Sequence, residues 1–557
     1  MAVIGLSIFY LLHEFRGLPM SEAMDQAQIG REILRGHGWE TKFIRPLAIG
    51  ELRRHGKDMA TAIQYDTYNA PIPPLLDAAA LFPINGHWDF KGTETVYAGD
   101  RAIACVGVIF FLASLAVLYF IGLDLFDQRL ALMATGLVLI CDTMWRYSLS
   151  GLPQMFLLLL FHLTVWAMLR GIRAQQFNQP HLRWVGAVGL GFGLMALTHA
   201  LSIFIFFPAL VYAFLYFRPR YGAGFIMLAV FAAVYAPWLA RNAMVCGDFR
   251  GMAGFSGLDG IVHPESGHMR RLSIDLGGAS VGFFAHNFRA NLAAQISRII
   301  EYMGWSFVAP FALAGVLHTF RRPLTETFRW LLLAMWGSAV CGMAVFGMKE
   351  EHSLAANQFH ILFVPLFICY GLAYILVLWE RRIRREPSHP KRSGTSVADA
   401  QLRVCLIVCI FIVSGIPVLN CLLLDRNHGT VEWPPYMPPS IAGLHDWISP
   451  EDIIGSDVPW AVAWYADRRS LWLPFDPPDL MSLSESKQLG GPIVGLYFTP
   501  VSGTQNLFGD LISGEYQHWT RFIVRTVDLA YSPYPFMLML GMPDCTLYMD
   551  RDRRPKK

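Results

Sequence analysis

The chain has 557 residues, of which 54% are apolar and only 16% are charged, whereas soluble domains carry about 25% charged residues. Its net charge of +3 is too small to indicate a nucleic-acid partner, and its nine scattered cysteines argue against a disulfide scaffold or a structural zinc site. Long runs such as 104–122 and 203–217 contain no charge. Because a spanning helix needs about 20 apolar residues, the composition predicts an integral membrane protein.

About eleven spans are predicted along the chain. The first is a short run near 2–12, which lacks the small-residue cleavage site of a signal peptide. The other ten lie near 102–122, 130–147, 152–169, 184–199, 201–217, 222–240, 299–319, 330–348, 359–379 and 403–424. The predicted fold class is therefore mainly α, a polytopic bundle of transmembrane helices.

The short loops on one side of the predicted bundle are rich in basic residues. These are Arg170, Arg173, Arg183, Arg218, Arg220, Arg321, Arg322, Arg329, Arg381, Arg382, Arg384, Arg385, Lys391 and Arg392. By the positive-inside rule this side is cytoplasmic, and the N-terminus lies there. Residues 381–402 are predicted to be a basic cytoplasmic linker; contact with anionic membrane lipid is the alternative for its polar part.

Three sizeable segments fall on the opposite, extracytoplasmic side. They are the first loop 13–100, the loop 241–298 and the tail 425–557 that follows the last span 403–424. The tail is predicted to form a small α/β domain, because short apolar runs alternate in it with helix-permissive stretches. Those strand-like runs are 453–456, 470–473 and 493–499.

The first loop begins with a predicted amphipathic helix at 21–39. Ser21 is a suitable N-cap, and glycines near the other end stop the helix. Glu22 and Asp25 are three residues apart, so both side chains project from one face at the membrane surface. A carboxylate there can act as a general base or hold a divalent cation near a phosphate. The alternative is that these acids only complement the helix dipole.

Six motifs in chain order carry a resemblance to a known class. They are IGREIL at 29–34 with GHGW at 36–39, NAPIPPLLDAAALF at 69–82, DRAIACVGVIFFL at 100–112, SGLPQM at 150–155, GLMALTHALSIF at 193–204 and PWLARN at 237–242. With this hydropathy, the chain resembles the GT-C class of glycosyltransferases. Within that class it is similar to the protein O-mannosyltransferase and lipid A aminoarabinose transferase superfamily. The resemblance marks residues 1–380 as a GT-C-like catalytic module.

The resemblance implies an enzyme, a hexosyl- or pentosyltransferase that uses a lipid-phosphate sugar. It would move the sugar from a polyprenyl-phosphate donor to a hydroxyl of a lipid, glycan or protein acceptor, with inversion. The reaction would take place on the outer face of the bacterial inner membrane. The alternatives are a flippase for lipid-linked sugars and an inactive assembly scaffold. Nearly uncharged span interiors argue against a transporter.

The resemblance also implies site residues. The family acid aligned through IGREIL falls on Glu22, while Asp25, one turn further along the same face, is the favoured base. At the position of a family acid the chain has Gln154, so a second acidic ligand is missing. No cofactor is therefore certain; a divalent ion, Mg²⁺ or Mn²⁺, stays open, with its ligands unknown.

Cationic or imidazole side chains at the outer membrane surface would stabilise the departing phosphate. The candidates are Arg45, Arg101, His199, Arg241 and His360. For each arginine the alternative is contact with lipid headgroups at a helix end.

Two further patterns favour structural interpretations. HPESGH at 263–268 is interpreted as a plain loop rather than a metal site. The aromatic run 458–474 is interpreted as domain core, with sugar stacking as the alternative.

Overall fold

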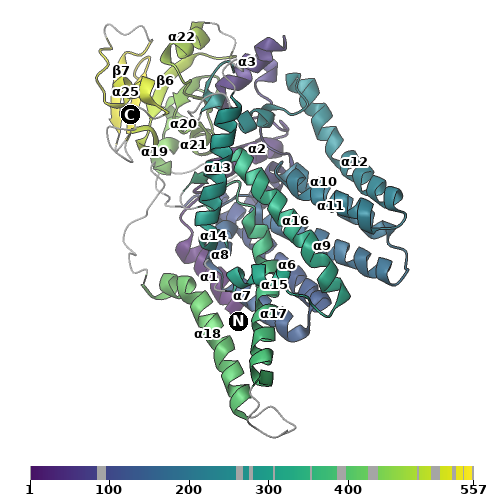
Figure 1. Cartoon of the computed structure of the whole chain (residues 1–557). Helices are drawn as coiled ribbons and strands as arrows, with labels where there is room; N and C mark the ends of the chain where they lie inside the picture. The colour runs from purple at the N-terminus through teal and green to yellow at the C-terminus, as the bar shows by residue number, and fades with distance from the viewer. Residues whose placement is uncertain are drawn as a thin grey trace.

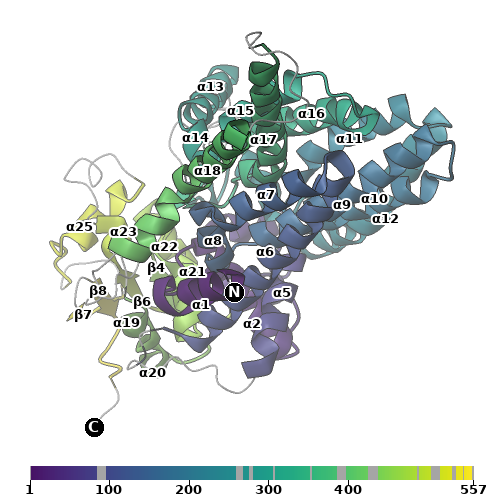
Figure 2. The ribbon, with the colours of Figure 1, turned by 90° about the horizontal axis from the view of Figure 1, so that it is seen from below.

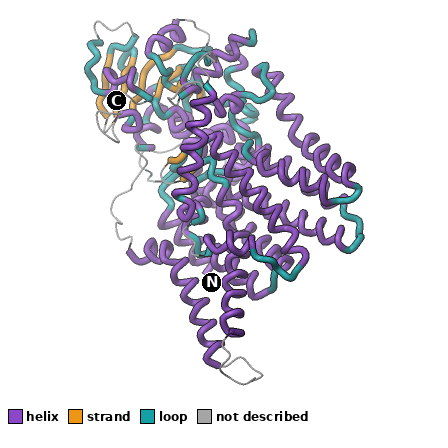
Figure 3. Tube along the Cα trace, in the orientation of Figure 1, coloured by secondary structure: helices purple, strands orange, loops and turns teal. Residues whose placement is uncertain are grey.

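The computed structural model describes residues 2–84, 94, 96–258, 267–274, 280–304, 308–351, 354–385, 397–424, 437–485, 489–503, 515–529, 535–542 and 545–554. These residues form a helical bundle with a small sheet at one end, which confirms the predicted fold class (Figures 1 and 3). Half of the predicted linker, residues 386–396, and most of HPESGH lie outside the described residues.

Six described helices are long and apolar enough to cross a membrane. They are α6 (Ala98–Leu125), α9 (Gln154–Gln176), α12 (Arg220–Cys246), α16 (Pro323–Phe346), α17 (His360–Arg385) and α18 (Val397–Leu424). A bent pair, α7 (Gln128–Leu139) and α8 (Asp142–Leu149), turns by 58° and would make a seventh span.

The remaining predicted spans form shorter helices, so length and composition support fewer spans than eleven. Three are α1 (Ala2–Phe9) with the π-helix η1 (Tyr10–Glu14), α10 (Leu182–Thr198) and α11 (Ser202–Tyr216). The run predicted at 299–319 divides into α14 (Ile299–Tyr302) and α15 (Ala309–Leu317). Gly304, with φ +70°, lies between these two helices, and this left-handed backbone ends helical geometry there.

The first loop contains the predicted acidic helix, observed as α2 (Ser21–Leu34). Ser21 is its first helical residue rather than its cap, because the Ser21 hydroxyl bonds carboxylates instead. The helix packs tightly on α5 (Ile72–Leu81): a Cβ added at Gly30 would lie 2.8 Å from the Pro74 carbonyl oxygen. Along the chain, β1 (Phe43–Ile44), α3 (Pro46–Arg54) and α4 (Met59–Ala62) come between α2 and α5.

The tail forms the predicted sheet. Its strands are β4 (Ile453–Ser456), β5 (Arg469–Trp472), β6 (Ile493–Phe498), β7 (Leu538–Met542) and β8 (Cys545–Met549). The order is β1-β5-β4-β6-β8-β7; the first four strands are parallel, and β8 is antiparallel to both β6 and β7. Strand β1 comes from the first loop, so the sheet joins two segments that the sequence assigns to separate domains. Figures 1 and 2 both show this sheet at one side of the helical bundle.

Helical segments cover both faces of the sheet. On one face, α21 (Pro459–Ala461) and the π-helix η6 (Val462–Ala466) join the core that continues into the membrane bundle. On the other face, α22 (Pro477–Glu485) packs its leucines into a second core. The connection from β4 to β5 thus runs over one face and the connection from β5 to β6 over the other.

Buried polar contacts fix this domain against the first loop. The Arg31 guanidinium, 1% exposed, donates to the carbonyl oxygens of Ala463 and Trp464 at 2.7 and 2.8 Å. It also lies 2.8 Å from an Asp467 carboxylate oxygen. At the start of α6, Asp100 accepts a 2.7 Å hydrogen bond from the Trp464 indole. The domain is therefore held in one position over the first loop.

Candidate functional site

A cavity of about 580 Å³ lies between the first loop, the segment that joins α16 to α17, and the tail domain. This volume falls within the range of about 300–1,000 Å³ that is usual for small-molecule sites. The lining includes the carboxylates Glu22, Asp25 and Glu351, the cations Arg45 and Lys349, and several aromatic rings from the tail domain. Charged and aromatic side chains thus share one cavity.

Two carboxylates in the cavity share one hydroxyl group. The Ser21 oxygen lies 2.7 Å from Glu351 Oε1 and 2.9 Å from Glu22 Oε2. The Ser21 backbone N–H also donates to Glu351, at 2.8 Å. A serine has one hydroxyl hydrogen, so it can donate to only one carboxylate at a time.

The Glu351 carboxyl, which shares Ser21 with Glu22, has a pKa near neutral pH. Burial, and then the charge of Glu22, raise the pKa of Glu351 to about 7, although the hydrogen bonds from Ser21 oppose the shift. A carboxyl with a pKa near 7 is partly protonated at neutral pH, so Glu351 can hold a proton there. Glu351 lies in β2 (Glu350–Glu351), which pairs with β3 (Leu354–Ala355).

Asp25 is held by three donors and is 2% exposed. Its Oδ2 accepts hydrogen bonds from Arg45 at 2.5 Å and from the Asn69 amide at 2.7 Å. Its Oδ1 accepts only a long bond, 3.3 Å, from Gln28. The Oδ1 atom is thus the less engaged oxygen of a carboxylate that lines the cavity.

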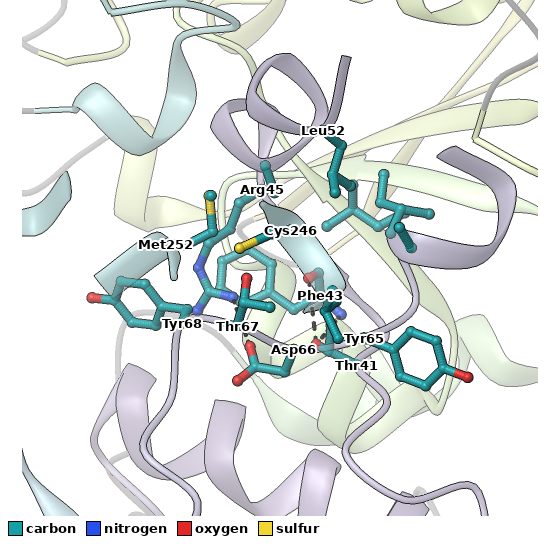
Figure 4. A pocket seen from close by; sticks show the side chains of 15 residues that line it. Thr41, Phe43, Arg45, Leu52, Tyr65, Asp66, Thr67, Tyr68, Cys246 and Met252 are labelled. Atoms are coloured by element: carbon teal, nitrogen blue, oxygen red, sulfur yellow. Dashed lines mark hydrogen bonds and ion pairs between the residues drawn. The ribbon is translucent and has the colours of Figure 1, made fainter. Parts of the chain in front are cut away.

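Arg45 connects the acidic residues with two aromatic rings. Its guanidinium lies 4.0 Å from the ring centres of both Phe43 and Tyr68 (Figure 4). It also lies 3.7 Å from Asp66. Burial and the charge of Asp25 raise the pKa of Asp66 to about 6, while Arg45 opposes that shift. Two acids and two rings therefore fix the position of one cation.

Lys349 brings a second cation to the same tyrosine. Its ammonium donates a 2.8 Å hydrogen bond to the Tyr68 hydroxyl. Its backbone has φ +52°, a left-handed conformation that is unfavourable for a residue with a side chain. Such strain is concentrated at functional sites, where the surroundings must maintain it.

The other predicted donor-binding residues do not line this cavity. Arg241 lies just behind it, where it donates to the Asp66 carbonyl oxygen and stacks on Trp238. The His199 ring packs 5.0 Å from the Phe359 ring. Arg101 is exposed on α6. His360 is fully buried and accepts a 3.1 Å hydrogen bond from the Trp336 indole. Membrane-surface position suggested all four, and motifs of the resemblance also included Arg101, His199 and Arg241. Neither signal determines which side of a helix faces a cavity.

Across the described residues, the one group of three potential metal ligands is Glu32, His37 and Glu40. The Glu32 carboxylate already lies 2.7 Å from Arg35 and 3.1 Å from Lys42. These cations neutralise the charge that a metal ion would need, so this donor set does not fit a divalent ion.

Sequence reasoning missed Lys349, Glu351 and Tyr68. The first two belong to a charged run, KEE at 349–351, between two predicted spans, and this run was a usable signal. Tyr68 gave no signal, because its role depends on two cations from distant segments.

Comparisons with known proteins agree with this fold. The sequence profile of the family described as dolichyl-phosphate-mannose-protein mannosyltransferase matches residues 91–240. No curated protein sequence matches the chain significantly.

Two solved structures show the likeness across the chain. ArnT from Cupriavidus metallidurans bound to undecaprenyl phosphate has a TM-score of 0.55 and 11% identity, with 99% of this chain and 97% of that one covered. The oligosaccharyltransferase of Archaeoglobus fulgidus in complex with Zn and sulfate has a TM-score of 0.50 and 12% identity, with 89% and 67% covered. At these identities the likeness shows the fold.

The fold and the family profile together place this chain in the GT-C class of membrane glycosyltransferase folds, and the resemblance drawn from its motifs is confirmed. The chain is an integral membrane protein with a glycosyltransferase architecture.

Proposed function

We propose that this protein transfers a sugar from a polyprenyl-phosphate donor to an acceptor hydroxyl, with inversion, at the extracytoplasmic face of the bacterial inner membrane. The observation that carries the proposal is one cavity in which Asp25 contacts Arg45 while Lys349 and Arg45 contact the same tyrosine. A leaving phosphate needs cations, and an attacking hydroxyl needs a base. Both kinds of group line this cavity.

The donor phosphate binds Arg45 and Lys349. Charge-assisted hydrogen bonds from a guanidinium and an ammonium stabilise the negative charge that develops as the phosphate departs. The stacking of Arg45 on Tyr68 orients the guanidinium before the donor arrives, so little reorganisation is needed.

Asp25 accepts the proton of the acceptor hydroxyl through its Oδ1. The acceptor oxygen attacks the anomeric carbon, and the bond from that carbon to the phosphate oxygen breaks with its electrons going to the phosphate. This single displacement inverts the anomeric centre. Glu22 is the second candidate base, because it shares Ser21 with Glu351, whose pKa lies near 7.

A reconstituted assay tests the function and the base together. Purified protein in liposomes is given a panel of radiolabelled undecaprenyl-phosphate sugars and membrane glycolipid, glycan and peptide acceptors. Transfer should fall by about 10²–10⁴-fold in Asp25→Asn, the range for loss of a general base. Asp58→Asn, which changes an exposed acid of the first loop outside the cavity, serves as the matched control.

Two results would contradict the proposal. Full activity in both Asp25→Asn and Glu22→Gln would refute an acidic base in this cavity. Donor movement between leaflets without transfer to any acceptor would favour the flippase. A loss confined to Glu22→Gln would assign the base to Glu22.

A further inference from the structure

The four parallel strands of the tail sheet all end at the cavity. Arg45 follows β1, Trp472 ends β5, and Val501 follows β6. Trp460 stands in α21, directly after the turn that leaves β4. All four residues line the cavity that holds the carboxylates.

The connections that leave the carboxyl ends of β4 and β5 diverge to opposite faces of the sheet. The chain leaves β4 over the face that α21 and η6 cover, and it leaves β5 over the face that α22 covers. Connections that diverge in this way leave a crevice between the two strand ends, and open α/β sheets bind their ligands in such crevices. Trp460 and Trp472 stand on the two sides of this one.

Three rings form an aromatic surface at the crevice. The Trp460 and Trp472 rings lie 5.8 Å apart and nearly perpendicular, and Phe43 lies 6.1 and 5.7 Å from them. Both tryptophans are only half-buried. They therefore face the cavity rather than fill a closed core.

Hydrogen bonds and stacking hold this aromatic surface in place. The Trp472 indole N–H donates a 3.1 Å hydrogen bond to the Tyr516 hydroxyl. The guanidinium of Arg270 lies 3.8 Å from the Tyr516 ring centre, and its own donors bind carbonyl oxygens, including that of Leu473 at 2.8 Å. A fixed ring with polar groups at its edge suits a ligand that has an apolar face and a hydroxylated rim.

We propose that this crevice binds a sugar ring of the acceptor, so that the acceptor is a saccharide rather than a polypeptide. The inference rests on the proposed glycosyl transfer and deepens it. The charged half of the cavity takes the donor phosphate, and the aromatic half takes a neutral pyranose ring against Trp460 and Trp472. This arrangement puts an acceptor hydroxyl in the same space as Asp25.

Binding without turnover tests the subsite. The full chain in lipid nanodiscs is studied by saturation-transfer NMR with three probes: methyl β-D-glucopyranoside, octyl β-D-glucopyranoside below its micellar concentration, and a serine-containing hexapeptide. Both glycosides should receive saturation at their ring protons, and the peptide should not. A stronger signal from the octyl glycoside would indicate a glycolipid headgroup, and equal signals would indicate a free glycan.

Substitutions locate the site of binding. Trp460→Ala and Trp472→Ala should weaken glycoside binding by at least about fivefold, the loss expected for a dominant aromatic contact. Trp472→Phe keeps a ring and should retain most of the signal, which distinguishes stacking from misfolding. Trp330→Ala, an exposed tryptophan on α16, should have no effect.

Absence of glycoside binding, binding of the peptide instead, or glycoside binding that survives both alanine substitutions would overturn the subsite. Binding of undecaprenyl phosphate to the same nanodiscs, followed by phosphorus NMR, reports separately on the donor half. Donor binding with no glycoside binding would therefore refute the subsite and leave the proposed transfer standing.

Discussion

The Ser21 hydroxyl lies 2.7 Å from the Glu351 carboxylate, although 330 positions separate the two residues in the chain. This contact joins the first-loop helix to the segment between α16 and α17. It also brings Glu22 close enough to Glu351 for the negative charge of Glu22 to raise the pKa of Glu351. The two carboxylates therefore make the stability of the fold depend on pH near neutrality.

Glu351→Gln should remove that dependence. The pKa of Glu351 is raised from 4.5 to about 7 in the folded protein, so the folded state binds this proton more tightly than the unfolded state. Its stabilising effect is full below about pH 4.5 and is lost as the pH rises through 7. The shift corresponds to at most about 3 kcal/mol. Thermal unfolding in nanodiscs should show wild type losing stability relative to Glu351→Gln between pH 5 and 8, and parallel curves would contradict the shift.

Arg45→Lys should weaken binding of the donor by about tenfold, because a lysine lacks the planar group that contacts Asp25 and stacks on Tyr68. Phosphorus NMR titration with undecaprenyl phosphate measures the affinity. Tyr68→Phe is the matched comparison: it keeps the ring beneath Arg45 and removes the hydrogen bond from Lys349. Tyr68→Phe should reduce the affinity for undecaprenyl phosphate less than Arg45→Lys does. A larger reduction would indicate that Lys349 is the main phosphate ligand.

Arg31→Ala should loosen the tail domain. The substitution leaves the carbonyl oxygens of Ala463 and Trp464 without this donor and removes a buried partner of Asp467, a loss of about 3–5 kcal/mol. Limited proteolysis should then cut the tail much faster than in wild type. Arg35→Ala removes a more exposed partner of Asp467 and should cost at most about 1 kcal/mol. Equal proteolysis of the two variants would refute the role of Arg31.

Gly30→Ala should destabilise the first loop by about 1–3 kcal/mol. The new methyl group would lie 2.8–2.9 Å from backbone atoms of Pro74 and Ala78, and those atoms belong to a helix that cannot move aside locally. Gly5→Ala, in α1, meets nothing within 4 Å and should be neutral or slightly stabilising. The two midpoints of thermal unfolding provide the comparison, and unchanged stability in Gly30→Ala would show that α2 and α5 can separate.

The sequence predicted the parts of the fold that local pattern controls. The runs at 453–456, 470–473 and 493–499 are strands within one residue of their observed ends, because a mostly parallel sheet that is covered on both faces is built from short, continuous apolar runs. Strand β1 gave no such signal, since its two residues are extended only because β5 pairs with them. The break within 299–319 also escaped prediction, because hydropathy does not register the backbone of Gly304.

In the candidate site, the residues of the first loop could be predicted from the sequence, but the residues that other segments contribute to the cavity could not. Glu22, Asp25 and Arg45 line the cavity, and all three lie in the first loop, where the sequence predicted the acidic helix. Arg101 and His360 shared the same membrane-surface position but lie away from it, one exposed and one enclosed. A single sequence gives the depth of such residues in the membrane; it does not give the rotation of each helix about its axis.

Strand β1 also sets an order of events during synthesis. Phe43 and Ile44 find their strand partners, Ser470 and Leu471, only after roughly 430 further residues have been made, which takes about 20–90 s at ~5–20 residues per second. Until then Arg45 lacks the strand neighbour that positions it beside the tryptophans. A nascent or truncated chain would thus contain the acidic and basic residues of the site but would lack a complete cavity. The segment of the protein that is made last therefore completes the site that the first loop begins.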